Sequence, residues 1–204
     1  MIESAHFHER IGQMGLAALY AVLLVRILAH VARTGRITSG LSLMTLSVLL
    51  WLVLTRRPAT KIDQSWPARI VTTAGTFGSL LFRPADVPGW LPDPATGLLA
   101  AGAALFTLAG FAALRGSFGL VPAHRGLVSR GPYRWIRHPL YTSYMCNHIA
   151  FMLAYPTLYN TVIWIIADGS QLIRLGYEER LLGTDPQYQA YRRTVRWRLV
   201  PGVF

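Results

Sequence analysis

The stretch PLYTSYMCNHIAFMLAYPTLYNTVIWIIADGSQLIRLG, residues 139–176, decides the fold of this chain. No Asp, Glu, Lys or Arg occurs between positions 139 and 167. This run is longer than a single membrane span requires, because about 20 apolar residues suffice to cross a bilayer. Tyr155-Pro156-Thr157 interrupts the run, because proline removes a backbone donor and restricts the residue before it. The stretch therefore predicts a tight helical hairpin of two spans, Pro139–Tyr155 and Thr157–Gly176.

Four further apolar segments precede the hairpin. Only 14% of the 204 residues are charged and the mean hydropathy is +0.35, whereas soluble chains carry roughly 25% charged residues. We therefore expect an all-α, polytopic integral membrane protein of about six helical spans. The four earlier spans are Ile11–Val31, Ile37–Thr55, Trp66–Phe82 and Gly97–Leu114. Whether the third span crosses fully is open, because it is short and rich in Gly and Thr.

The basic residues are distributed as in a membrane protein. The formal net charge of +11 arises mainly in loops and ends between apolar segments, which the positive-inside rule explains without nucleic acid. Arginine counting places both termini in the cytoplasm, and the Arg-rich composition suggests a bacterial inner membrane. Arg26 and His30 share one face of the first span. They are interpreted as snorkelling toward headgroups, with a substrate path as the alternative.

Two polar clusters flank the hairpin. Arg137-His138-Pro139-Leu140-Tyr141 begins it and Glu178-Glu179 follows it. Ionisable groups near a membrane are rare and usually line a cavity or substrate path, so we expect the clusters to converge on one pocket. Arg174 and Glu178, four residues apart, share a helical face. They form either a local ion pair or a binding site for ligand groups of opposite charge.

Two other features bear on the chemistry. The loop between Leu114 and Pro139 contains four glycines and several cations, which fits a backbone that wraps a small anionic ligand. His148, inside the hairpin, is either a general base or an interhelical hydrogen-bonding residue, and the latter is favoured. No metal site is predicted.

The region from Leu127 to Pro201 resembles the isoprenylcysteine carboxyl methyltransferase and phospholipid methyltransferase group of integral-membrane enzymes. The matching pattern is Leu127-Val128, Gly131-Pro132-Tyr133, Arg137-His138-Pro139-Leu140-Tyr141, Glu178-Glu179, Leu182, Tyr188, Tyr191 and Arg198-Leu199-Val200-Pro201. One departure is Ser143, where the family usually has Gly.

The resemblance implies a methyltransferase that uses S-adenosylmethionine in a cytoplasmic-side pocket. The cofactor-binding residues that it implies are Leu127, Val128, Tyr133, Arg137, His138, Pro139, Leu140, Tyr141, Glu178 and Glu179. Arg174 occupies the position that contacts the methyl acceptor in the prenylcysteine enzymes. The acceptor would be amphipathic, either a prenylcysteine-type carboxylate or a phospholipid amine, and would enter from the bilayer.

On this interpretation the chain is one membrane domain. Residues 1–114 form a four-span scaffold, and residues 115–204 form a catalytic half with the cofactor-binding loop, the hairpin and a C-terminal cap. Two alternatives remain: a nicotinamide-dependent membrane reductase of the sterol-reductase type, and a non-catalytic membrane scaffold. The identity of the acceptor and the oligomeric state are open, and no nucleic-acid partner is expected.

Overall fold

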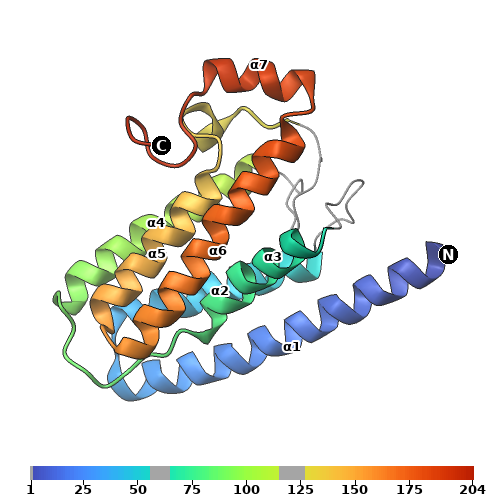
Figure 1. Ribbon diagram of the computed structural model, residues 1–204. Coiled ribbons are helices and arrows are strands. Elements are labelled where there is room, and N and C mark those ends of the chain that lie inside the picture. The colour runs from blue at the N-terminus through green and yellow to red at the C-terminus, as the bar shows by residue number, and fades with distance from the viewer. Residues whose placement is uncertain (1, 56–64, 115–126) are drawn as a thin grey trace.

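The computed structural model describes residues 2–55, 65–114 and 127–204. It contains seven α-helices in these ranges, which confirms the all-α prediction: α1 (Ile2–Thr34), α2 (Ile37–Thr55), α3 (Trp66–Gly78), α4 (Asp93–Leu114), α5 (Pro139–Ala154), α6 (Leu158–Leu182) and α7 (Pro186–Thr194) (Figure 1). Two short 3-10 helices, η1 (Ser79–Leu81) and η2 (Gly131–Arg134), complete the order. The predicted cationic loop with Arg56, Arg57 and Lys61, and most of the glycine-rich loop, lie outside the described residues.

Proline and threonine residues fix the starts of α5 and α6. Pro139 occupies the first turn of α5, where its missing N–H costs nothing. Thr157 caps α6 by accepting a 3.1 Å hydrogen bond from the Asn160 amide, so the predicted break between the spans is confirmed. The third predicted span is divided, because α3 ends at Gly78 and η1 continues to Leu81.

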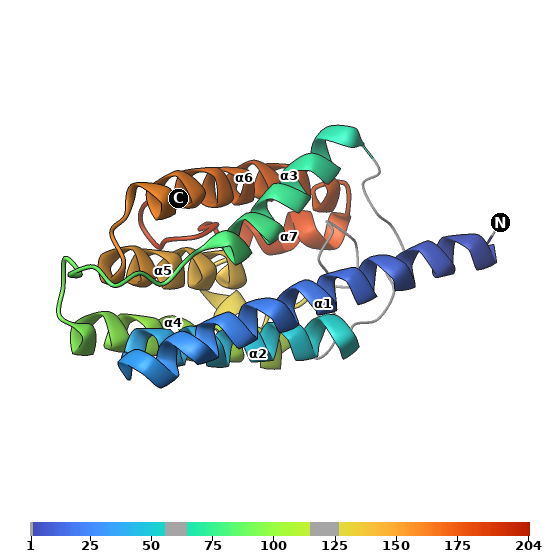
Figure 2. The ribbon, with the colours of Figure 1, turned by 90° about the horizontal axis from the view of Figure 1, so that it is seen from below.

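The two arms of the hairpin pack on different partners. α5 lies along α4, and α6 lies along α3 (Figures 1 and 2). Small residues allow both approaches: a Cβ placed on Gly110 would lie 2.7 Å from Leu140, and one on Gly75 would lie 3.2 Å from Gln171. α1 packs on α2 at the edge of the bundle. The space between α5 and α6 is therefore left to long side chains that meet across it.

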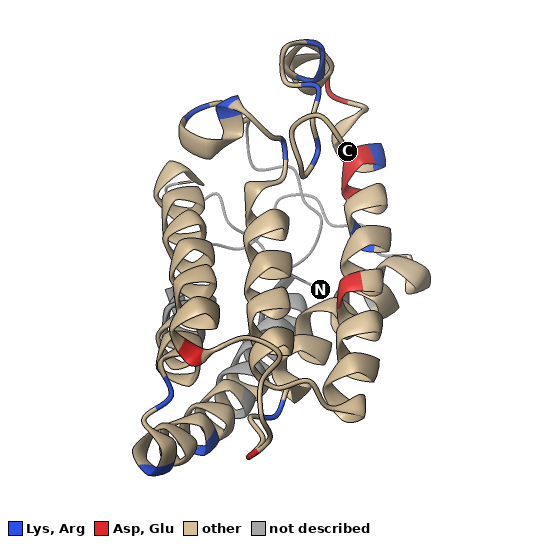
Figure 3. Cartoon of the chain, turned by 90° about the vertical axis from the view of Figure 1, so that its left-hand side faces the viewer, with Lys and Arg blue, Asp and Glu red and all other residues tan. Residues whose placement is uncertain are grey.

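One helical segment in the described part of the chain, Asp93–Leu114, is long and apolar enough by itself to meet the criterion for a membrane span. The number of crossings thus stays a prediction. Many large apolar side chains on the outer helix surfaces are exposed, including Val25, Leu105 and Ile165. Basic residues gather near the two ends of the bundle and are sparse between them (Figure 3).

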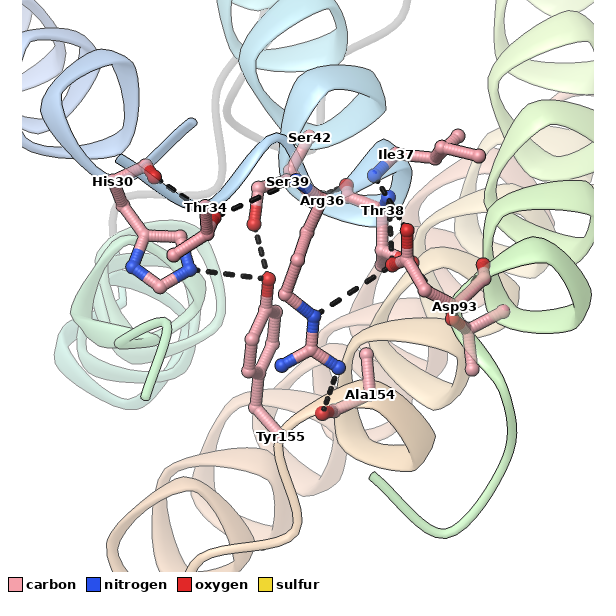
Figure 4. A network of polar contacts seen from close by, with 11 residues as sticks. His30, Thr34, Arg36, Ile37, Thr38, Ser39, Ser42, Asp93, Ala154 and Tyr155 are labelled. Carbon is pink, nitrogen blue, oxygen red and sulfur yellow. Dashed lines mark hydrogen bonds and ion pairs between the residues drawn. The ribbon is translucent and has the colours of Figure 1, made fainter. Parts of the chain in front are cut away.

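A polar network closes the end of the bundle that lies opposite α7 (Figure 4). Asp93 accepts hydrogen bonds from the Ile37 and Thr38 amides at 2.7 and 3.3 Å. Arg36 lies 4.3 Å from the Tyr155 ring centre and donates to the Ala154 carbonyl at 3.0 Å. The network thus joins the α1–α2 turn to the start of α4 and to the α5–α6 turn.

The same network corrects the interpretation of His30. Its side chain is buried, at 5% exposure, and its Nε2 lies 3.5 Å from the Tyr155 hydroxyl, which also contacts Ser39. His30 therefore does not snorkel to the headgroups, because Tyr155 supplies a polar partner inside the fold. Arg26 is exposed, as snorkelling requires.

Candidate active site

The two predicted motifs meet in two clusters, and the first cluster forms around Glu179. Its side chain, 7% exposed, receives hydrogen bonds from three residues. Arg137 donates from Nε at 2.8 Å and from Nη2 at 3.1 Å, and the Tyr188 hydroxyl donates at 2.6 Å. His138 Nε2 lies 2.7 Å from Oε1. The mouth of α5 and the end of α6 therefore converge, as the two motifs predicted.

The charge of Glu179 is strongly stabilised. Burial alone raises the pKa of a carboxyl group, but the bonds from His138, Arg137 and Tyr188 outweigh burial and hold the pKa of Glu179 well below its ordinary value. Bidentate Arg–carboxylate pairs of this kind are the stronger class of hydrogen bond. Glu179 is thus an anion in the folded protein at all but strongly acid pH.

Arg137 also holds the C-terminal segment. Its Nη1 donates to the Val195 and Arg196 carbonyls at 2.9 and 2.6 Å, and its backbone N–H donates to Trp197 at 2.9 Å. The guanidinium is thus engaged by protein groups on all three nitrogens. Its contacts hold the C-terminal segment against the start of α5.

The second cluster surrounds Glu178, the neighbour of Glu179 on α6. Tyr141 donates a 2.8 Å hydrogen bond to Glu178 Oε2 and is its single hydrogen-bond donor in the described ranges. The guanidinium carbon of Arg174 lies 5.4 Å from the Tyr141 ring centre. Arg174 Nη1 contacts Gln171 Oε1 at 3.4 Å. Within the described residues Arg174 and Glu178 form no ion pair, because Tyr141 stands between them.

Other aromatic residues extend this cluster. Burial, followed by the charge of Glu178, raises the pKa of Tyr133 far above its usual range. The Tyr133 carbonyl accepts a 2.6 Å bond from the Tyr191 hydroxyl. This bond joins α7 to η2.

The remaining predicted residues lie at the margin of this arrangement. Pro139 and Leu140 are buried in the first turn of α5, and Leu140 packs against Gly110. Leu127 is 37% exposed, and no described polar contact joins it or Val128 to the two clusters. Ser143, the departure from the family pattern, is fully buried and donates to the Leu140 carbonyl at 2.8 Å, so its hydroxyl is satisfied within the helix.

His148 bridges the two arms deeper in the hairpin. Its Nδ1 lies 2.6 Å from Asp168 Oδ1, and Trp164 Nε1 donates to Asp168 Oδ2 at 2.7 Å. The interhelical interpretation of His148 is thus confirmed. The sequence did not identify Asp168 as the partner of His148, although an acidic residue at the end of an apolar run indicates that it has a polar partner.

Several functional neighbours were missed by sequence reasoning. Tyr188 was seen only as part of the family pattern, and its bond to Glu179 had no separate signal. Gln171, which contacts Arg174, lies one turn before it on α6, and the sequence did not single it out. In the part of the chain that the structure describes, no group of three His, Cys, Asp or Glu side chains is arranged to hold a metal ion.

The geometry can accommodate a charged, polar ligand. Glu178 offers a half-buried carboxylate beside the Tyr141 phenol, and Arg174 offers a buried cation on the same helix. No curated protein matches the chain. The model of the isoprenylcysteine carboxyl methyltransferase family matches residues 103–184, which include α5, α6 and the residues of the two clusters other than those of α7 and the C-terminal segment. This match confirms the resemblance, over that segment, to the isoprenylcysteine carboxyl methyltransferase family, whose members are membrane-embedded, S-adenosylmethionine-dependent enzymes.

Proposed function

We propose that this enzyme methylates the carboxylate of an amphipathic, lipid-like acceptor on the cytoplasmic side of a membrane. The observation that carries the proposal is the placement of Arg174 and Glu178 on either side of Tyr141. The two charged groups share a face of α6 without neutralising each other. Such an arrangement suits two ligands that meet there, one with cationic and hydroxyl groups and one with an anionic group.

Glu178, Tyr141 and Tyr133 would hold the cofactor. The chemistry of these groups fits S-adenosylmethionine, which carries an ammonium, a sulfonium and two ribose hydroxyls: the Glu178 carboxylate accepts from donors of this kind, and aromatic faces favour nearby cations. The cofactor-binding roles predicted for Leu127, Val128, Pro139 and Leu140 remain part of the proposal.

Arg137, His138 and Glu179 would act as a brace in this site. Because their side chains bond to one another and to the C-terminal segment, their main contribution is to fix α5 against α6. Such a brace keeps Tyr141 and Glu178 in register, and precise positioning of reacting groups is a large part of catalysis.

Arg174 would hold the acceptor carboxylate. Its side chain is 8% exposed and its Nε has no hydrogen-bond partner among the described residues, so it has donor capacity left for an anion. When bound, S-adenosylmethionine supplies an electrophilic methyl group, so the carboxylate displaces the thioether with its own electron pair and no proton moves. The chain has only to align the oxygen and exclude water.

An amine acceptor is less well served by these residues. A protonated amine must lose a proton before it can be methylated. His148, the histidine inside the hairpin, bonds to Asp168 about two helical turns along α5 from Tyr141, and Glu178 lies with Tyr141 in the proposed cofactor site. A carboxylate needs no such base, which favours the prenylcysteine-type acceptor over the phospholipid amine.

The proposed topology follows the ends of the bundle. One end carries η2, α7 and the C-terminal segment, with basic residues including Arg130, Arg192 and Arg193 (Figures 1 and 3). The other carries Arg33, Arg36 and Arg83 together with Asp86 and Asp93. The excess of cations at the first end supports a cytoplasmic cofactor site and six crossings.

Calorimetry on the protein in lipid nanodiscs tests the function. Saturable binding of S-adenosylmethionine without binding of NADPH, and transfer of a labelled methyl group to an N-acetyl-S-prenylcysteine, are the expected results. Binding of NADPH alone would support the reductase alternative. Binding of neither by folded protein would support a non-catalytic scaffold.

A further inference from the structure

α3 packs on α6 in a regular antiparallel register. A Cβ placed on Gly78 would lie 3.2 Å from the Ala167 Cβ, and one placed on Gly75 would lie 3.2 Å from the Gln171 side chain. Moving three residues toward the start of α3, from Gly78 to Gly75, thus corresponds to moving four residues, about one turn, toward the end of α6. One further turn brings Thr72 level with Arg174. Thr72 and Gly75, three residues apart, lie on one face of α3, so both are directed toward α6.

Two polar atoms at this level have no hydrogen-bond partner among the described residues. They are the Thr72 hydroxyl oxygen and Arg174 Nε. Both side chains are buried, at 8% exposure each. Buried polar groups in proteins are nearly always hydrogen-bonded, and a threonine in an apolar helix usually bonds to its own backbone or to a neighbouring helix. The pairing of two unsatisfied groups on facing helices indicates a shared ligand.

The chemistry of the pair defines that ligand. Arg174 Nε can only donate, and a hydroxyl can donate while it rotates to suit its partner. A cationic donor beside a hydroxyl matches an anionic oxygen, and the Arg174 charge repels an ammonium group. Thr76, one turn further along α3, has a third unpartnered hydroxyl at 9% exposure, so the donor-rich face of α3 continues away from Glu178.

We propose that Thr72 of the scaffold helix α3 donates a hydrogen bond to the carboxylate of the methyl acceptor that Arg174 binds. This inference rests on the proposed function and extends it, because it assigns part of the acceptor site to residues outside the matched segment 103–184. Thr72 is then a specificity residue: together with the Arg174 cation it stabilises a carboxylate headgroup. The scaffold half of the chain thereby takes part in substrate selection.

Three variants of the full chain in nanodiscs test the assignment. Thr72→Val removes the hydroxyl at nearly constant shape, and Thr72→Ser keeps the hydroxyl. Thr73→Val is the matched control, because Thr73 is the exposed neighbour on the same helix. Each variant is measured for S-adenosylmethionine affinity by calorimetry and for kcat and KM with an N-acetyl-S-prenylcysteine. Binding of the corresponding carboxamide, in which the carboxylate of this compound is replaced by an amide, is measured in parallel.

The expected result is specific to one substrate and one atom. Thr72→Val raises KM for the carboxylate about tenfold or more, as loss of a hydrogen bond to a charged group implies. Its affinity for S-adenosylmethionine changes less than twofold. Thr72→Ser stays near the wild-type value, Thr73→Val is unchanged, and Thr72→Val prefers the carboxylate to the carboxamide less strongly than the wild type, because Arg174 remains.

Two results would overturn the assignment in distinguishable ways. If the wild-type protein methylates the carboxylate and Thr72→Val behaves like Thr73→Val, Thr72 does not contact the acceptor and the proposed function stands. If the wild-type protein binds S-adenosylmethionine and methylates only a phospholipid amine, the carboxylate site and the proposed acceptor both fail.

Discussion

The guanidinium carbon of Arg174 lies 5.4 Å from the centre of the Tyr141 ring, and the hydroxyl at the other end of the same ring donates to Glu178. Tyr141 thereby separates two opposite charges that α-helical geometry puts on one face. A direct ion pair would use the capacity of both groups. The interposed tyrosine leaves each charge available to a ligand, and it couples the proposed acceptor site to the proposed cofactor site.

Arg174→Ala should impair methylation more than cofactor binding. Loss of a hydrogen bond between charged groups lowers affinity by roughly 10- to 100-fold, so we expect kcat/KM for the carboxylate acceptor to fall by about that factor. The affinity for S-adenosylmethionine should change less than threefold in calorimetry. Arg180→Ala is the control, since Arg180 is exposed on the same helix. An equal loss of both activities would assign Arg174 to the cofactor pocket or the fold.

Glu178→Gln should show the opposite selectivity. The substitution keeps the shape of the side chain but removes the charge that would attract cationic and hydroxyl groups of the cofactor. We expect the dissociation constant of S-adenosylmethionine to rise about tenfold, and Tyr141→Phe to raise it by less, because it removes only the bond to Glu178. An unchanged constant in Glu178→Gln would exclude Glu178 from the cofactor site.

Much of the fold could be predicted because long segments without charged residues indicate apolar helices. The segments without Asp, Glu, Lys or Arg became α2, α4 and the two arms of the hairpin, and Pro156 ended α5 as expected. The convergence of Arg137 and His138 on the Glu178-Glu179 pair was also predictable, because the hairpin returns the chain to the level at which it began.

The division of roles between Glu178 and Glu179 could not be predicted. Adjacent helical residues point in directions about 100° apart, so one acid enters the brace and the other faces Tyr141. The sequence does not tell which acid takes which role. Contacts of α3 with α6, and of His30 with Tyr155, join segments far apart in the chain, and no local pattern encodes them.

Glu179→Gln should destabilise the fold. The change leaves the buried Arg137 guanidinium without its counter-charge, and removal of one partner from a buried ion pair costs about 3–5 kcal/mol. We expect a clear fall in the midpoint of thermal unfolding, measured in nanodiscs at one scan rate. Glu178→Gln, the same change at the half-buried neighbour, should leave the midpoint nearly unchanged. A similar fall in both variants would show that the effect is not specific to the brace.

The brace should also make the protein sensitive to acid. Because the pKa of Glu179 is lowered in the folded state from an ordinary value of 4.5, its contribution to stability is fully present above about pH 4.5 and is lost as the pH falls toward the folded value. The unfolding midpoint should hold from pH 7 to 5 and decline below that range. Glu179→Gln should flatten this decline, and an undiminished decline in that variant would assign it to other carboxyl groups.

His148→Ala should weaken the hairpin without slowing methyl transfer to a carboxylate. Asp168 would keep only the bond from Trp164, and leaving a buried acceptor partly unsatisfied costs about 1–3 kcal/mol. The unfolding midpoint should therefore fall, whereas Cys146→Ala, a change at an exposed neighbour, should not alter it. At a temperature where both variants are folded, kcat should match the wild-type value, because a carboxylate nucleophile has no proton to lose. A large loss of kcat, with a pH profile that shifts between His148→Ala and the wild type, would instead make His148 a general base and point to an amine acceptor.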